Sequence, residues 1–223
     1  MIIAGYIMFF ILLTFYLKKL DYKKISRKML IKGIVMGIMS IIITVIISIF
    51  INAQSHYGYN HELKINYFIN VFVYAALVEE ISKFLALKIY NPTKKNDYVI
   101  YSLIIGITFW LVENIVYGLG GDYYIQWKNR LIHPGHISYQ VLMGILLYIS
   151  SLHKSKSKRI ISIVLSILLT TFIHALFNCL RGYGYFQISK SFVSFYITFF
   201  EYYIIIVGLY VFKKKIGDNL EKN

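Results

Sequence analysis

The sequence predicts an all-α protein, a polytopic integral membrane bundle of about seven transmembrane helices. Of its 223 residues, 58% are hydrophobic, and several apolar runs reach the roughly 20 residues that span a bilayer. Lysine and arginine gather in the short segments between these runs, which is typical of membrane topology. The net charge of +14 therefore indicates basic loops at a membrane surface, and we expect no nucleic-acid partner.

Each apolar run is long enough for a helix, and none alternates with the period of a membrane β-strand. The first run lacks a basic leader and a small-residue cleavage site, so we expect a retained span. The connections are too short for a separate soluble domain, which predicts one integral membrane domain over residues 1–223. The predicted spans cover residues 1–17, 31–51, 65–90, 98–119, 133–152, 160–180 and 190–212.

Alternate connections are rich and poor in positive charge. The connection KKLDYKKISRK after the first span is strongly basic, whereas NAQSHYGYNHELK after the second is nearly free of positive charge. The connections NPTKKND and HKSKSKR and the tail KKKIGDNLEKN are basic again. Because basic loops stay in the cytoplasm, this alternation predicts an outside N-terminus and a cytoplasmic C-terminus.

Four consecutive predicted spans carry ionisable groups in their interiors, although charge within a membrane is costly. Their positions fall in the outer half or the middle of the membrane, where the groups could converge. The last span carries Glu201 alone. The polar residues of the four spans are Glu79, Glu80 and Lys83 in the third, Glu113 and Asn114 in the fourth, His136 in the fifth, and His174 and Asn178 in the sixth.

Each of these groups, taken alone, admits a structural role. Glu79 or Glu80 could pair with Lys83 on the same helix face and fix the register of that helix. Glu113 could accept hydrogen bonds from its neighbours, and a lone His174 is more often a core histidine than a ligand. The joint occurrence favours a shared polar site, because every charge adds to the cost of membrane insertion.

Paired glutamates suit general acid–base chemistry. Two close carboxylates in a low-dielectric setting do not both ionise easily, so one can accept a proton from water and return it to a leaving amine. A histidine followed four residues later by an asparagine can donate hydrogen bonds to a developing oxyanion. Two histidines with one or two glutamates also form a zinc set with an open water position. Spacing leaves metal-bound and metal-free water as alternatives.

These residues resemble four motifs of the PrsW family of intramembrane proteases, which is related to the CAAX-prenyl endopeptidases and bacteriocin-processing proteins. The resemblance runs over roughly residues 75–180, within a predicted catalytic core of about residues 65–180. It departs at Gln140, where a small hydroxyl residue is expected. The matching residues are Glu79-Glu80-Ile-Ser-Lys83 (E-E-x-x-K), Phe109-Trp-Leu-Val-Glu113-Asn114 (F-x-x-x-E-N), Arg130 with His136 and Gly144, and His174-Ala-Leu-Phe-Asn178.

The resemblance implies a peptidase that cuts a membrane-associated substrate by glutamate- or histidine-activated water. The family's known role is cleavage of a membrane-anchored anti-sigma factor on its extracytoplasmic side. If zinc takes part, the candidate ligands are Glu113, His136 and His174. The implied roles are water activation by Glu79 with support from Glu80 and Lys83, completion of the water or metal site by Glu113 and His136, and oxyanion stabilisation by His174 and Asn178. Asn114 is a further supporting residue.

Two other functions are compatible with the same residues. A non-catalytic relative, such as a bacteriocin-immunity protein, would bind a peptide without needing the glutamates. A transporter would use them to relay protons or metal ions, but the sequence shows neither internal repeats nor paired broken helices. The expected partners are a membrane-anchored protein or peptide and the lipid bilayer. A composition rich in lysine, isoleucine, tyrosine and asparagine suggests a bacterial plasma membrane.

Overall fold

The regular structure of the described residues is entirely helical, which confirms the predicted all-α class. The computed structural model describes residues 26–51, 64–92, 94–119, 133–182 and 190–215. The predicted span 1–17 lies outside these ranges. The helices cover the other six predicted spans and are α2 (Arg27–Phe50), α3 (Lys64–Asn70), the π-helix η3 (Val71–Ala76), α4 (Leu77–Tyr90), α5 (Lys95–Leu119), α7 (Gly135–Ser151), α8 (Lys156–Gly182) and α9 (Lys190–Lys215).

Local sequence signals set several helix ends. The Ser26 hydroxyl caps α2 by accepting a hydrogen bond from the backbone N–H of Met29 at 3.2 Å. Helix α4 ends at Tyr90, and the next residue, Asn91, has a φ of 54° in the left-handed region that asparagine tolerates. Pro92 follows and cannot continue a helix. Helix α7 begins directly after Pro134.

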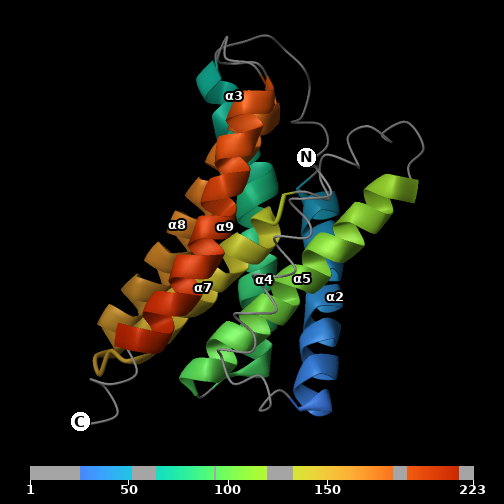
Figure 1. Ribbon diagram of the computed structural model, residues 1–223. Helices are drawn as coiled ribbons and strands as arrows, with labels where there is room; N and C mark the ends of the chain where they lie inside the picture. Colours follow the sequence, from blue (N-terminus) through green and yellow to red (C-terminus); the bar gives the residue numbers. More distant parts are fainter. Residues whose placement is uncertain (1–25, 52–63, 93, 120–132, 183–189, 216–223) are drawn as a thin grey trace.

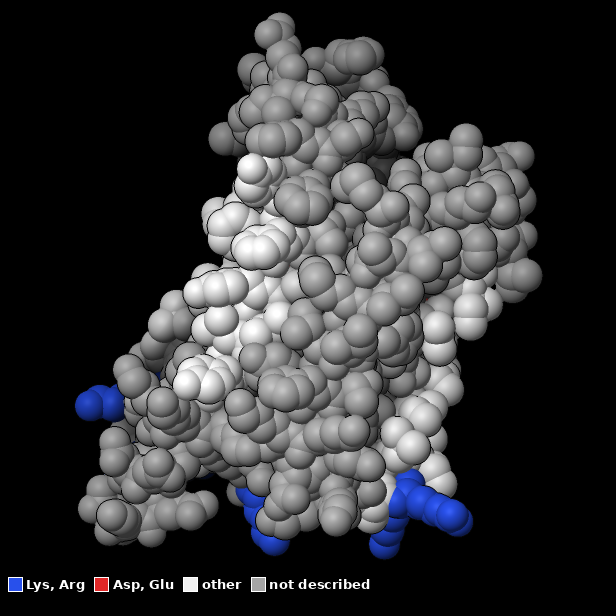
Figure 2. Space-filling view, viewed as in Figure 1, with Lys and Arg blue, Asp and Glu red and all other residues white. Residues whose placement is uncertain are grey.

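Helices α4 and α7 lie in the middle of the bundle (Figure 1). Helix α7 packs against α5, α8 and α9, and α4 packs against α2, α5 and α8. The start of α2, the α4–α5 connection and the α7–α8 connection lie at the same end. Lysine and arginine side chains visible in Figure 2 gather toward that end. This grouping agrees with the predicted alternation of basic connections, while the assignment of that end to the cytoplasm stays a prediction.

Three helices are long and apolar enough to cross a membrane within the described part of the chain: Arg27–Phe50, Asp97–Val116 and Lys156–Leu180. The α3–α4 run is interrupted by charged residues, and α7 has only 17 residues. Large apolar side chains point outward, and Phe50 is 85% exposed. The protein is therefore a helical membrane protein, and the number of seven spans stays a prediction.

The interior holds the polar residues and the closest helix contacts. Glu80, Lys83 and Gln140 are fully buried. Gly144 brings α7 onto α5, because a Cβ placed there would lie 2.2 Å from the Ser102 hydroxyl oxygen and 2.8 Å from a backbone carbonyl oxygen. Small residues at helix interfaces replace the hydrophobic effect as a source of packing energy inside a bilayer.

Replacing Gly144 by alanine is expected to destabilise the bundle by roughly 1–3 kcal/mol, because the added methyl group forces α5 and α7 apart. Unfolding followed in detergent micelles measures this loss. Gly208→Ala is the matched control, since a Cβ there meets side-chain methyl groups and no backbone, Ile145 Cδ1 at 3.0 Å and Val141 Cγ1 at 3.9 Å. Equal stability of the two variants would contradict the close contact at Gly144.

Candidate functional site

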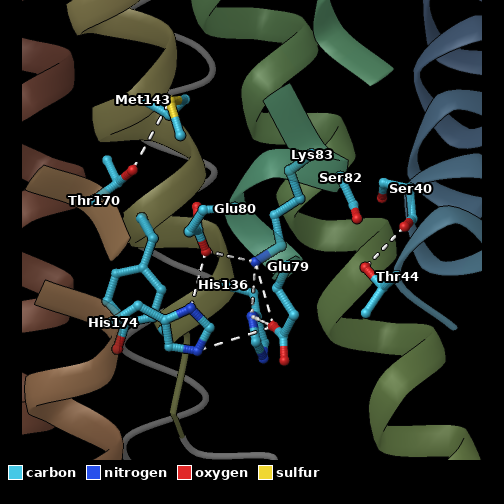
Figure 3. Close-up of polar contacts among 12 residues, drawn as sticks. Ser40, Thr44, Glu79, Glu80, Ser82, Lys83, His136, Met143, Thr170 and His174 are labelled. Atoms are coloured by element: carbon cyan, nitrogen blue, oxygen red, sulfur yellow. Dashed lines mark hydrogen bonds and ion pairs between the residues drawn. The ribbon is translucent and has the colours of Figure 1, made fainter. Parts of the chain in front are cut away.

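Six predicted site residues from four helices meet inside the bundle. Figure 3 labels Glu79, Glu80, Lys83, His136 and His174. Helix α4 contributes three of them, because residues three and four apart lie on one helix face. The π-helix η3 directly precedes the first turn of α4, and π-helical turns often occur beside functional sites. The six residues are Glu79, Glu80 and Lys83 of α4, Glu113 of α5, His136 of α7 and His174 of α8; we call them the polar cluster.

Lys83 is the cation of the polar cluster, and its side chain is fully buried. Its Nζ lies 2.8 Å from Glu80 Oε1, 3.7 Å from Glu79 Oε2 and 3.1 Å from His136 Nδ1. The ammonium also stands 4.2 Å from the centre of the Phe109 ring, a cation–π distance. Buried charges need such partners, because removal from water costs several kcal/mol for each ion.

Both histidines have a carboxylate on one ring nitrogen. His136 Nε2 lies 2.6 Å from Glu113 Oε2, and His174 Nδ1 lies 3.0 Å from Glu80 Oε1. An ionised carboxylate only accepts hydrogen bonds, so these contacts assign the proton of each neutral imidazole to the nitrogen that faces the acid. The other nitrogens, His136 Nδ1 and His174 Nε2, then carry lone pairs, and they lie 3.4 and 3.9 Å from Glu79 Oε2.

The two adjacent glutamates differ in their surroundings. Glu80 is fully buried and is held between Lys83 and His174. The Glu79 side chain is 16% exposed, and its Oε2 faces both histidines without a hydrogen-bond partner among the described residues. Glu79 is therefore the carboxylate of the pair that is placed to meet water, whereas Glu80 supports its neighbours.

The donor set fits a divalent metal ion. Glu79, His136 and His174 each offer one ligand atom, and these atoms lie within 4.8 Å of one another. Two histidines and a glutamate form a catalytic zinc set, and carboxylates on the far histidine nitrogens are the usual support of such ligands. Three carboxylates against one ammonium leave two negative charges when all are ionised, which a divalent cation would balance. Glu113, a predicted ligand, supports His136 in this arrangement.

The predicted asparagines and Gln140 lie around the polar cluster. Asn114 donates from Nδ2 to the Trp110 carbonyl at 2.7 Å, and Asn178 is half-buried one turn after His174 on α8. Gln140 is fully buried, and neither atom of its amide has a hydrogen-bond partner within the described ranges. The roles of the two asparagines stay predictions, and Arg130 lies outside the described residues.

Two aromatic residues border the site: Tyr139 was not predicted, and Phe109 was named only as the first residue of the F-x-x-x-E-N motif, with no role in the site. The Tyr139 ring stacks on the His174 imidazole with 4.7 Å between ring centres and 24° between planes. The Phe109 ring lies 5.0 Å from the His136 imidazole and beneath Lys83. Tyr139 follows His136 by three residues, so helical spacing would have placed it on the same helix face as His136. Many aromatic residues share such spacing by chance, and the signal is therefore weak.

Comparison with protein families identifies a match over most of the chain. Residues 26–209 match the model of the family described as PrsW family intramembrane metalloprotease. The match confirms the family that the sequence motifs predict. Searches of the curated proteins and of the solved structures each found no match.

Replacing Lys83 by methionine is expected to lower the free energy of unfolding by about 3–5 kcal/mol, because two carboxylates lose their buried cation. Unfolding in mixed detergent micelles measures the change. Lys88→Met is the control, since Lys88 is exposed on the same helix. Adding Glu80→Gln to Lys83→Met should recover part of the loss, and wild-type stability of Lys83→Met alone would refute the ion pair's role.

Proposed function

The chain belongs to the PrsW family of intramembrane metalloproteases, and from this premise we propose that it hydrolyses a peptide bond of a membrane-associated substrate with water activated at Glu79. The observation that carries the proposal is the separation of the two glutamates. Lys83 and His174 hold Glu80, whereas Glu79 faces two histidine lone pairs at the partly exposed edge of the polar cluster.

In the proposed reaction, Glu79 takes a proton from water, and the water oxygen forms a bond to the scissile carbonyl carbon. The carbon–nitrogen bond then breaks, and the proton held by Glu79 passes to the leaving amine. Lys83 supplies positive charge beside the developing oxyanion. His174 Nε2 is an acceptor in the tautomer assigned above, so its predicted donor role requires the imidazolium form.

His136 and His174, with Glu79 Oε2, are the residues that would hold the metal. A zinc ion there would supply Lewis-acid activation of the water. Glu113 and Glu80 fix the orientation of the two imidazoles, and the second oxygen of Glu79 is left to accept the proton. His136 Nδ1 would be the nitrogen offered to the metal, and it is also the nitrogen that Lys83 contacts at 3.1 Å.

We place the cut near the outer half of the bilayer of a bacterial plasma membrane, on the basis of the predicted orientation. The proposed substrates are a membrane-anchored anti-sigma factor or an exported peptide. The helices that carry the polar cluster fall within the predicted core of about residues 65–180, in a single membrane domain.

The variants Glu79→Gln and His174→Ala are expected to lower cleavage by a factor of 100 or more, the usual contribution of a general base or an essential ligand. Cleavage is read by co-expressing the chain with epitope-tagged, single-span membrane proteins and separating the fragments on gels. His153→Ala, in the α7–α8 connection, is the histidine control. Undiminished cleavage in both site variants would reject the mechanism at Glu79 and His174, whereas absence of cleavage by wild type would favour a peptide-binding relative.

Purified protein is expected to contain about one zinc ion per chain, because the ligand set is of the catalytic zinc type. Elemental analysis should find the ion in wild type and His153→Ala, and not in His136→Ala or His174→Ala. Chelation should stop cleavage, and added zinc should restore it. Full cleavage by metal-free protein would refute the metal and leave the role of Glu79 standing.

A further inference from the structure

Helix α9 carries a buried carboxylate that the polar cluster does not use. Glu201 is fully buried, whereas Phe199, Phe200 and Tyr203 beside it on α9 are exposed. Thr198, one turn earlier, contacts the ring of His133 just before α7. Residues three apart share a helix face, so α9 turns one polar face toward the beginning of α7.

Glu201 is connected to the polar cluster through one side chain. Its Oε1 accepts a hydrogen bond from the Tyr139 hydroxyl at 2.9 Å. The ring of Tyr139 stacks on His174 and lies edge-on to His136, with 6.3 Å between those ring centres. One tyrosine thus contacts both histidines with its ring and Glu201 with its hydroxyl.

The backbone leaves room for this connection. A Cβ on Gly135 would lie 2.7 Å from Glu201 Oε1 and 3.0 Å from the Tyr139 hydroxyl oxygen. Gly135 is the first residue of α7 and directly precedes His136. The carboxylate therefore sits against the N-terminal end of α7, where the helix dipole favours negative charge.

An apolar side chain would be the less costly choice at position 201. A carboxylate inside a membrane protein adds to the cost of insertion, and its retention calls for a specific contact. The Tyr139–Glu201 hydrogen bond fixes the position of the hydroxyl oxygen and therefore the direction of the ring axis. Because a phenol O–H prefers to lie in the ring plane, the bond also favours one rotation of the ring about that axis. A ring held in this way limits the tilt of the stacked imidazole.

We propose that Glu201 is a positioning residue for the peptidase site: it anchors the Tyr139 hydroxyl, and the Tyr139 ring holds the His174 imidazole in its working orientation. The inference rests on the proposed function for its kinetic consequence. The contact between Glu201, Tyr139 and His174 itself does not depend on catalysis.

The test is a cycle of Glu201→Leu, Tyr139→Phe and the double variant, with Glu201→Gln as the conservative change. Each single variant should lower kcat roughly ten- to a hundredfold, the cost of a misplaced catalytic group. KM should change less than about twofold, because neither residue is placed against substrate. The double variant should be no slower than either single one, and Glu201→Gln should retain most activity because its amide oxygen still accepts from Tyr139. Tyr203→Phe, exposed on α9, is the control.

A second measurement reads the position of His174 without any substrate. In protein labelled with ¹³C at the histidine ring, the His174 signal, assigned with His174→Ala, should move in Glu201→Leu and Tyr139→Phe. It should stay in place in Glu201→Gln and Tyr203→Phe. An unmoved signal in folded Tyr139→Phe, or additive kcat losses in the double variant, would overturn the proposal. Absence of cleavage by wild type would reject the proposed function alone, since the signal still reports the contact.

Discussion

The buried ion pair between Lys83 and Glu80 is the interaction on which the rest of the site depends. An ammonium in a low-dielectric interior is tolerated only with close partners, and Lys83 has them on its own helix and on α7. Glu80 also accepts a hydrogen bond from His174 of α8. One pair thus draws three helices together, and it leaves Glu79 as the partly exposed carboxylate of the two.

Close backbone approach makes these side-chain contacts possible. At Gly106 of α5, a Cβ would lie 2.9 Å from the His136 carbonyl oxygen, so α5 touches α7 at the residue that binds Glu113. The positions of the site's side chains therefore depend on the helix interfaces around them. Along the bundle apolar side chains face outward and the polar cluster lies inward, because in a bilayer the surrounding solvent is hydrocarbon.

The sequence predicted the helices well, since spans of about 20 apolar residues have few alternatives in a membrane protein. The sequence also predicted that Glu79, Glu113, His136 and His174 share one site, because every intramembrane charge needs a partner. It could not separate Glu79 from Glu80, since adjacent residues differ only in which neighbouring helix they face. Tyr139 carried no polar signal within its span and was missed. Orientation and span number stay predictions.

The placement of Lys83 three residues after Glu80 has a consequence for biogenesis. Helix α4 is synthesised before α5, α7 and α8, so its charges meet the bilayer before His136 or His174 exists. A pair within one helical turn forms as soon as that turn forms, and it offsets part of the insertion cost at once. The contacts with Glu113 and the histidines can follow as later helices arrive, in keeping with assembly from helices already inserted. The Lys83–Glu80 salt bridge that orders the finished site thus first lowers the cost of inserting α4, its most polar helix, into the bilayer.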